Sequence, residues 1–179
     1  PQKTRTPSTG GATAATTARV ETATRPRLVA IGASTGGPVA LQQVLSALPA
    51  DYPFPVLVAV HMPAEFTATF AERLDRICPL RVKLAADGDP LLPGEVLVAP
   101  GGMQTLVGLR DSRLRVQLAP PGDQLYKPCI DLLFGSVARA LGDAAIGVIL
   151  TGMGSDGTEG ARQLKAGGAT VWSQDRDSS

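Results

Sequence analysis

Short apolar runs alternate with longer segments of mixed polarity from residue 27 onward. The short runs are rich in Val, Leu, Ile and Ala and have the length of strands, so we predict that they are buried strands. These strands are expected at residues 28–33, 56–60, 82–85, 96–99, 105–109, 114–118, 145–150 and 169–173. The longer segments place apolar residues at helical spacing, which predicts helices. These helices are expected at residues 39–48, 65–77, 130–141 and 158–166.

The order of these elements predicts the architecture. Strands that alternate with helices are joined by crossover connections, which gives a predominantly parallel sheet with helices on both faces. The exception is the pair of strands on either side of residues 110–113, whose short connection predicts an antiparallel hairpin. We therefore expect an α/β fold of three layers with one hairpin. The buried face of the second helix is expected to be formed by Phe66, Phe70, Leu74 and Ile77.

The first 25 residues differ from the rest in composition. They contain eight Thr and five Ala, a single Val, and no Leu, Ile, Met or aromatic residue, so they have nothing to bury. We predict that residues 1–25 are an interdomain linker or a disordered tail and that residues 26–179 form one domain. A chain of 179 residues has the usual size for a single domain.

Charge and residue content exclude several classes of protein. The formal net charge is +1, but residues 1–25 carry four basic side chains and one acidic, a net of +3, which leaves −2 for the rest. With 4% aromatic residues and no basic stripe, the domain lacks the features of a nucleic-acid-binding protein. No apolar run approaches the roughly 20 residues that cross a bilayer. Cys78 and Cys129 lie far apart in a chain with one histidine, so no zinc-type spacing exists and we expect free thiols in a reducing compartment.

The loop after the first expected strand contains a serine flanked by glycines. Residues 32–36 match the pattern G-x-S-x-G, in which the glycines let Ser34 sit on a sharp strand-to-helix turn with an exposed hydroxyl. Pro38 suits the first helical position and makes Gly37 the expected cap, which leaves Ser34 without a capping role. The alternative is an ordinary glycine turn in which Ser34 bonds only to local backbone, because short matches of this kind also arise by chance.

Two further polar groups follow other strands. His61, the only histidine, comes directly after the second expected strand, and Asp156 lies in the loop after the seventh. Ligands bind at the carboxyl ends of parallel strands, so we expect Ser34, His61 and Asp156 to meet at that edge of the sheet. They would form a triad in which His61 removes the Ser34 proton and Asp156 accepts the Nδ1 proton of His61. The alternatives are a structural histidine, and a capping box formed by Asp156 and Glu159.

Several longer motifs also resemble, in the same order, the catalytic domain of the bacterial chemotaxis protein-glutamate methylesterase family, CheB. The resemblance covers about residues 27–177. The motifs lie at residues 31–38, 61–63, 99–102, 128–134 and 150–157.

The resemblance implies a serine esterase of Rossmann-like topology that hydrolyses glutamate γ-methyl esters on chemoreceptors and deamidates particular receptor glutamines. Ser34 would be its nucleophile, His61 its base and Asp156 the third member of the triad. The backbone N–H groups of Thr35 and Met153 would match the oxyanion donors of the family. No metal ion and no organic cofactor are required by this chemistry.

The resemblance further implies partners and a location. The substrates would be methyl-accepting chemotaxis receptors, and the usual family member carries an N-terminal phosphorylatable receiver domain that this chain lacks. We expect a cytoplasmic monomer with no nucleic-acid partner and no insertion into the membrane. The chain departs from the family at Cys129, where serine is common, and at Ser155, where asparagine is frequent. The family continues beyond residue 179, so we expect the C-terminal end of the domain to be truncated.

Two other functions remain open on the sequence alone. A glycine-rich loop between a strand and a helix also occurs in nucleotide-binding oxidoreductases, but the pattern here is not G-x-G-x-x-G. In addition, the next strand ends in His61 rather than in the acidic residue expected on a ribose. The second alternative is a receptor-binding module without catalysis, for which replacing Ser34 would leave function intact.

Overall fold

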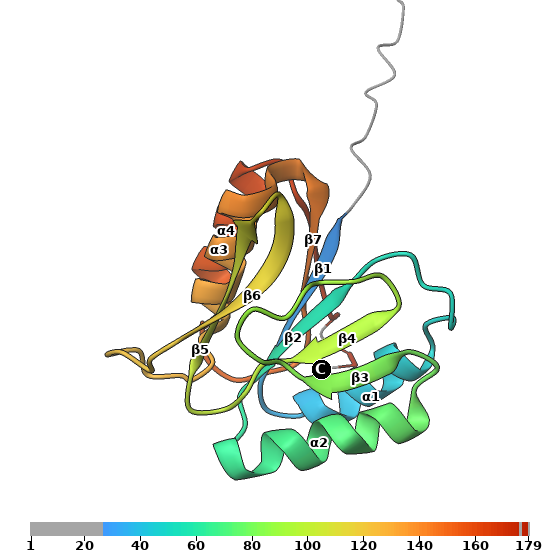
Figure 1. The fold of residues 1–179 in the computed structure, drawn as a ribbon. Helices are drawn as coiled ribbons and strands as arrows, with labels where there is room; N and C mark the ends of the chain where they lie inside the picture. The colour runs from blue at the N-terminus through green and yellow to red at the C-terminus, as the bar shows by residue number, and fades with distance from the viewer. Residues whose placement is uncertain (1–26, 176, 179) are drawn as a thin grey trace, which may run out of the picture.

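The computed structural model describes residues 27–175, 177 and 178, and Figure 1 shows its fold. The linker predicted at residues 1–25 lies outside the described residues. The strands are β1 (Leu28–Ala33), β2 (Val56–Val60), β3 (Arg81–Leu84), β4 (Glu95–Val98), β5 (Gln104–Arg110), β6 (Arg113–Ala119), β7 (Ala145–Ile149) and β8 (Thr170–Ser173). The helices are α1 (Gly37–Ser46), α2 (Ala64–Ile77), α3 (Ile130–Leu141) and α4 (Thr158–Ala166), with a short 3-10 helix at Gly142–Ala144. Every predicted strand and helix is present, and the ends differ by no more than two residues.

Six of the strands form one sheet in the order β3-β4-β2-β1-β7-β8, and all neighbouring pairs in it are parallel. The chain moves from β1 to β2 on one side and later returns to place β7 on the other side of β1. The crevice at the carboxyl end of β1 is therefore the topological switch point of the sheet, where α/β proteins bind their ligands.

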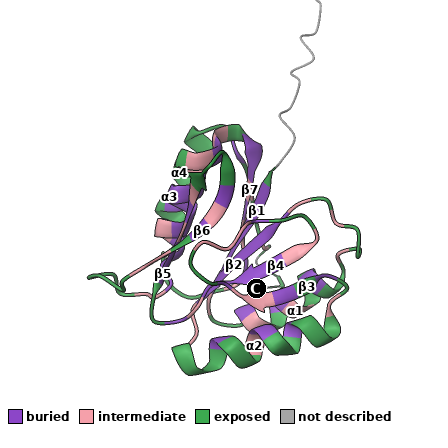
Figure 2. Ribbon diagram, viewed as in Figure 1, coloured by how far each residue is buried: buried purple, intermediate pink, exposed green. Residues whose placement is uncertain are grey.

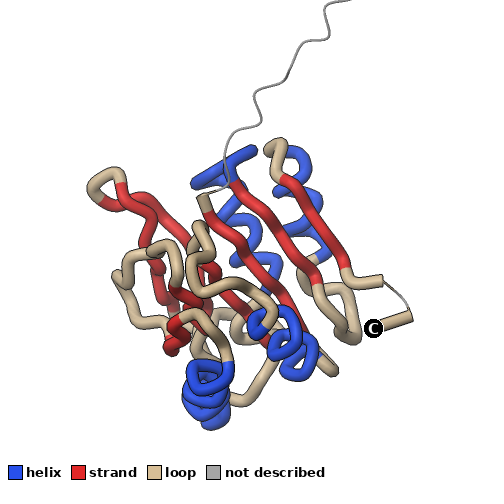
Figure 3. Tube along the Cα trace, turned by 90° about the vertical axis from the view of Figure 1, so that its right-hand side faces the viewer, coloured by secondary structure: helices blue, strands red, loops and turns tan. Residues whose placement is uncertain are grey.

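Helices cover both faces of this sheet, as Figure 3 shows from the side. Alternate residues of β1 belong to different cores: Leu28 and Ala30 pack in the core that contains α3 and α4, and Val29 and Ile31 in the core that contains α1 and α2. This alternation follows from the two-residue period of a strand. The predicted three-layer, predominantly parallel α/β fold is confirmed.

The predicted hairpin is also confirmed, and it lies outside the main sheet. Strands β5 and β6 form a separate antiparallel pair, β6 makes one further bridge between Arg115 and Pro90, and β5 packs against α3. The buried Ser136 of α3 binds the hairpin, because its hydroxyl accepts a hydrogen bond of 2.9 Å from the backbone N–H of Val107 in β5. The first residue of β5, Gln104, lies beside the N-terminus of α3, because its side-chain oxygen accepts a hydrogen bond from the N–H of Cys129.

The buried face of α2 agrees with the prediction at Leu74, which is fully buried, and at Phe70, which packs against the core, but differs at the other two predicted positions. Thr67, Ala71 and Leu74 face the sheet, whereas Phe66 is 57% exposed and Ile77 42% exposed. Thr67 and Ala71 keep helical spacing to Leu74 and occupy the inward positions next to the predicted Phe66 and Phe70. Figure 2 shows the outer side of α2 exposed along its length.

Candidate active site

Ser34 is the first residue after β1, on a tight turn into α1. Its backbone N–H donates to the carbonyl of Thr151 at 3.0 Å, and its own carbonyl accepts from the N–H of Gly37 at 2.7 Å. The residue that caps α1 is Gly36, with φ of 77°, and not Gly37 as the sequence predicted. The left-handed conformation at Gly36 turns the chain sharply, and glycine adopts it without steric cost.

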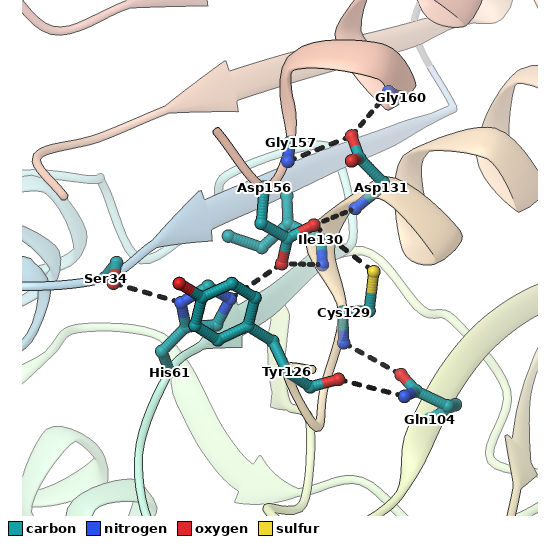
Figure 4. A network of polar contacts seen from close by, with 10 residues as sticks. All are labelled: Ser34, His61, Gln104, Tyr126, Cys129, Ile130, Asp131, Asp156, Gly157 and Gly160. Atoms are coloured by element: carbon teal, nitrogen blue, oxygen red, sulfur yellow. Dashed lines mark hydrogen bonds and ion pairs between the residues drawn. The ribbon is translucent and has the colours of Figure 1, made fainter. Parts of the chain in front are cut away.

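His61 lies beside Ser34 because of the register between β1 and β2. Ala33 pairs with Val60, so Ser34 and His61 are the next residues of two neighbouring parallel strands. The N–H of His61 donates to the carbonyl of Ala33 at 3.0 Å, which continues the ladder by one step. The imidazole Nδ1 is 3.0 Å from Ser34 Oγ, and Nε2 is 2.7 Å from Asp156 Oδ2, as Figure 4 shows.

The two ring nitrogens have the opposite roles to those predicted. We expected Asp156 to accept the proton of Nδ1, but Asp156 contacts Nε2. A carboxylate only accepts hydrogen bonds, so Nε2 carries the proton, and Nδ1 is the acceptor for the Ser34 hydroxyl. The cause is distance from the backbone: the serine on the adjacent strand meets the ring nitrogen nearer to Cβ, while Asp156 approaches the far side of the ring.

Asp156 is held by four hydrogen-bond donors. Oδ2 accepts from His61 Nε2 and from the N–H of Ile130 at 2.8 Å. Oδ1 accepts from the N–H of Asp131 at 2.9 Å and from the thiol of Cys129 at 3.2 Å. Burial by itself raises the pKa of this carboxyl, but the hydrogen bonds from His61 and from the two backbone N–H groups outweigh it and lower the pKa to about 2. Asp156 is therefore an anion at neutral pH, at the positive end of α3.

Asp131 holds the next helix in the same way. Its Oδ1 accepts from the N–H groups of Gly157 at 2.9 Å and Gly160 at 2.7 Å, at the start of α4. Asp131, in α3, thus binds the N-terminus of α4, and Asp156, which precedes α4, binds the N-terminus of α3. We call these two residues the crossed aspartates. The capping box of Asp156 and Glu159, the alternative considered for Asp156, is absent, because α4 begins after Gly157 with no side-chain cap.

Three residues outside the predicted triad support the site. The ring of Tyr126 stacks on that of His61, with centroids 4.0 Å apart and planes inclined by 4°. Cys129, noted only as a departure from the family, touches Asp156, and burial together with that contact raises the pKa of its thiol to about 11. Gln104 binds the loop that carries Tyr126 and Cys129, through hydrogen bonds to the backbone of both residues. Nothing in the one-dimensional pattern marked Tyr126 or Gln104, because their roles depend on how a loop folds back.

A cavity of about 310 Å³ opens beside Ser34. Its walls include His61, Met153 and Ile130, and Arg162 and Lys165 of α4 also line it. The loop that carries Met153 lies against the serine, since an ideal Cβ on Gly152 would be 2.7 Å from Ser34 Cβ. Thr35 follows Ser34 directly, so both expected oxyanion donors lie in loops that border the serine.

Within residues 27–175 and 177–178, no group of three His, Cys, Asp or Glu side chains is placed to hold a metal ion. No helix in the same part of the chain is long and apolar enough to cross a membrane.

Comparison with known proteins places the chain in a family. The family model described as CheB methylesterase matches residues 29–179. The chain belongs to the CheB methylesterase family. A CheB-family relative from Aliivibrio fischeri, named protein-glutamate methylesterase/protein-glutamine glutaminase, is 55% identical over 153 residues. One of the same name, numbered 1, from Pseudomonas aeruginosa is 58% identical over 153 residues. The match covers 85% of this chain but 41% of each relative, so the chain spans about two fifths of their length.

A solved structure from the CheB family has the same fold. The crystal structure of the Thermotoga maritima CheB methylesterase catalytic domain is 38% identical and superimposes with a TM-score of 0.82. The superposition covers 85% of this chain and 81% of that one. The similarity therefore extends over about four fifths of that catalytic domain.

Proposed function

We propose that this chain is a protein-glutamate methylesterase that hydrolyses glutamate γ-methyl esters on chemoreceptors. The observation that carries the proposal is the line of contacts from Ser34 through His61 to Asp156, at the switch point of a CheB-family fold. A hydroxyl, an imidazole and an ionised carboxylate in this order are the components of a serine hydrolase. The same site would release ammonia from receptor glutamines, because an amide presents the same carbonyl to the serine.

In the first step, Ser34 Oγ attacks the ester carbonyl while His61 Nδ1 removes the hydroxyl proton. The proton on Nε2 stays between His61 and Asp156, and the carboxylate stabilises the imidazolium that forms. Asp156 keeps its negative charge throughout, since its pKa of about 2 lies far below neutral pH. The tetrahedral intermediate then collapses as Nδ1–H protonates the departing methanol, leaving an acyl-enzyme on Ser34.

The oxyanion of the intermediate needs hydrogen-bond donors near Ser34. We assign this role to the backbone N–H groups of Thr35, the next residue in the loop of Ser34, and of Met153, in the loop that packs against the serine. Water then attacks the acyl-enzyme with His61 as the base and releases a glutamate carboxylate. None of these steps uses a metal ion or an organic cofactor.

The proposal includes the setting of the reaction. The substrate is the cytoplasmic part of a methyl-accepting receptor, so the enzyme acts in the cytoplasm. Its activity is controlled by a phosphorylatable receiver domain in the full-length protein, and the catalytic domain itself is a monomer.

The decisive test is methanol release from methylated chemoreceptor membranes by the parent chain and by Ser34→Ala. We expect turnover to fall by about 10⁴ to 10⁶ in the variant, because the nucleophile is lost. Ser155→Ala is the matched control: this exposed serine lies in the same loop as Asp156, and its loss should leave turnover near that of the parent. Equal release by the parent and Ser34→Ala, with both folded by circular dichroism, would reject the assignment.

Two results would favour the competing functions. A nucleotide that raises the melting temperature would indicate a nucleotide-binding protein. A parent chain that binds receptor membranes but releases no methanol would indicate a binding module without catalysis.

A further inference from the structure

Gln104, the first residue of β5, is a buried polar side chain outside the triad. It is 3% exposed and makes three hydrogen bonds, all to the backbone of one loop. Its Nε2 donates to the carbonyls of Pro121 and Tyr126, each at 3.0 Å, and its Oε1 accepts from the N–H of Cys129 at 2.8 Å. Both sides of the amide are used, so its orientation is fixed.

The segment held by Gln104, residues 121–129, touches the proposed triad at two points. Tyr126 stacks on the ring of His61, and the Cys129 thiol donates to Asp156 Oδ1. Figure 4 shows Gln104 bonded to the backbone of both residues, on the side away from the triad. The Gln104 side chain therefore holds both residues that contact the triad: Tyr126, which stacks on His61, and Cys129, which bonds to Asp156.

We propose that Gln104 is a positioning residue for the triad: it fixes the loop whose Tyr126 and Cys129 set the orientation of His61 and Asp156. The inference rests on the proposed esterase function. Gln104 does not line the cavity beside Ser34, so it acts through the loop and not on the substrate.

The physical basis is the narrow tolerance of the His61 contacts. Nδ1 must meet Ser34 Oγ at 3.0 Å while Nε2 meets Asp156 at 2.7 Å, so a rotation of the ring that improves one contact weakens the other. The stacked Tyr126 ring blocks tilting of the imidazole out of its plane. Without the Gln104 side chain, three backbone groups of the loop lose their hydrogen-bond partners. The loop must then shift so that these groups can bond to water or to other atoms, and this shift moves it away from His61 and Asp156.

The first experiment compares Gln104→Met with Thr105→Val. Methionine has the length of glutamine but none of its hydrogen bonds. Thr105, the next residue of β5, is fully buried, and its hydroxyl has no partner among the described residues, so valine preserves its shape and removes nothing that is used. On a methyl ester substrate, we expect Gln104→Met to lower kcat by about 10- to 100-fold with KM within about twofold. Thr105→Val should match the parent.

The second readout does not require activity. His61 is the only histidine, so the spectrum of ¹⁵N-histidine-labelled protein reports its tautomer without assignment. The neutral imidazole of the parent should carry its proton on Nε2 and none on Nδ1, and the same should hold for Thr105→Val. Gln104→Met should show a mixture of tautomers. If the parent itself released no methanol, the function would fail, yet these spectra would still test the positioning role.

Defined results would overturn the inference. A folded Gln104→Met protein with the parent's kcat, or with a lower kcat but the parent's histidine spectrum, would exclude positioning through His61. If Gln104→Met does not fold, Tyr126→Ala and Tyr126→Phe replace it. The alanine should lower kcat by about tenfold and mix the tautomers, and the phenylalanine, which keeps the stack, should recover most of both. The parent's spectrum in Tyr126→Ala would equally contradict the proposal.

Discussion

Ser34 and His61 follow neighbouring strands at equivalent positions. This placement determines which nitrogen of the His61 ring faces Ser34 and which faces Asp156. In the Ser-His-Asp arrangement of chymotrypsin-like enzymes, Nε2 serves the serine and Nδ1 the aspartate. Here Nδ1 is 3.0 Å from Ser34 and Nε2 is 2.7 Å from Asp156. The proposed proton transfer from Ser34 is the same with either orientation, because either nitrogen accepts a proton when the other carries one.

Gly152 shows how little space surrounds the serine. An added Cβ would lie 2.7 Å from Ser34 Cβ, a contact that neither backbone can relieve without moving. We expect Gly152→Ala to lower kcat by about 100-fold, because Ser34 or the loop bearing Met153 must shift. The measurement is methanol release under saturating substrate.

Gly94→Ala is the control for a general effect of alanine at a glycine. Gly94 has φ of 78° and nothing within 4 Å of an added Cβ. This variant should lose about 1 kcal/mol of stability through backbone strain and keep the parent's kcat. Unchanged kcat in Gly152→Ala would show that the loop can move without harm.

Single residues also show how far the sequence alone could reach. Ser34, His61 and Asp156 were found because each follows a strand with a clear apolar pattern, and parallel strands end at one edge. The ring orientation of His61 was predicted wrongly, because it depends on the register between two strands and not on the order of residues. Tyr126 and Gln104 were missed because a loop with no periodicity brings them to the site.

At the scale of secondary structure, the crossed aspartates join α3 and α4 at their N-termini. Asp131 serves the start of α4 and Asp156 the start of α3. Strands and most helix ends were predictable from apolar runs, glycines and prolines. The exchange of capping roles was not, since Asp156 is close in sequence to α4 and a cap is usually supplied locally.

Removing the Asp131 side chain should weaken the start of α4. We expect Asp131→Ala to lower the free energy of unfolding by about 1 to 3 kcal/mol, because the N–H groups of Gly157 and Gly160 lose their acceptor. Urea unfolding followed by circular dichroism measures the loss. Asp51→Ala, at an exposed aspartate in a turn, should be within about 0.5 kcal/mol of the parent. Equal stability of the two variants would contradict the role given to Asp131.

Asp156 should make the fold sensitive to acid. Its pKa is about 2 in the folded chain against an ordinary value of 3.8. A lowered carboxyl pKa stabilises the fold above the ordinary value, and this stabilisation is lost as the pH falls toward the folded value. The expected contribution is on the order of 2 kcal/mol at neutral pH, lost between about pH 4 and pH 2.

Urea unfolding of the parent and Asp156→Asn from pH 7 to pH 2.5 tests this expectation. The stability difference between them should shrink as the pH falls through this range. A constant difference at all pH values would show that the charge of Asp156 does not stabilise the fold. Asp51→Asn provides the control for a carboxylate at an exposed position.

At the scale of the whole molecule, two cores meet across one sheet, and the site lies where loops from both converge. Ala33 and Val60, the residues that directly precede Ser34 and His61, pack in the core that contains α1 and α2. Asp156 and Cys129 lie at the start of α3, which belongs to the other core. The architecture was predictable because the alternation of strands and helices is regular. The placement of the hairpin against α3 was not predictable, because the apolar pattern of β5 and β6 indicates only that these two strands pair with each other.

Cys129 offers a probe of global opening. It is 6% exposed and its thiol pKa is raised to about 11 by burial, so the native thiol is both covered and protonated near pH 8. In a Cys78→Ser background, we expect iodoacetamide to modify Cys129 at least about 10³-fold more slowly than in the unfolded chain. The rate should rise with urea in parallel with unfolding. Fast labelling without urea would show that the α3 end of the site opens locally.

The crossed aspartates have a consequence for genetics. Loss of Ser34 removes a hydroxyl from a turn that is held by backbone bonds, so an inactive Ser34→Ala protein should accumulate in cells to the parent's level. Loss of Asp156 removes the anchor of α3 as well as the charge, and a less stable protein is degraded faster. Null alleles at these two positions should therefore be told apart by an immunoblot: full abundance at Ser34, reduced abundance at Asp156.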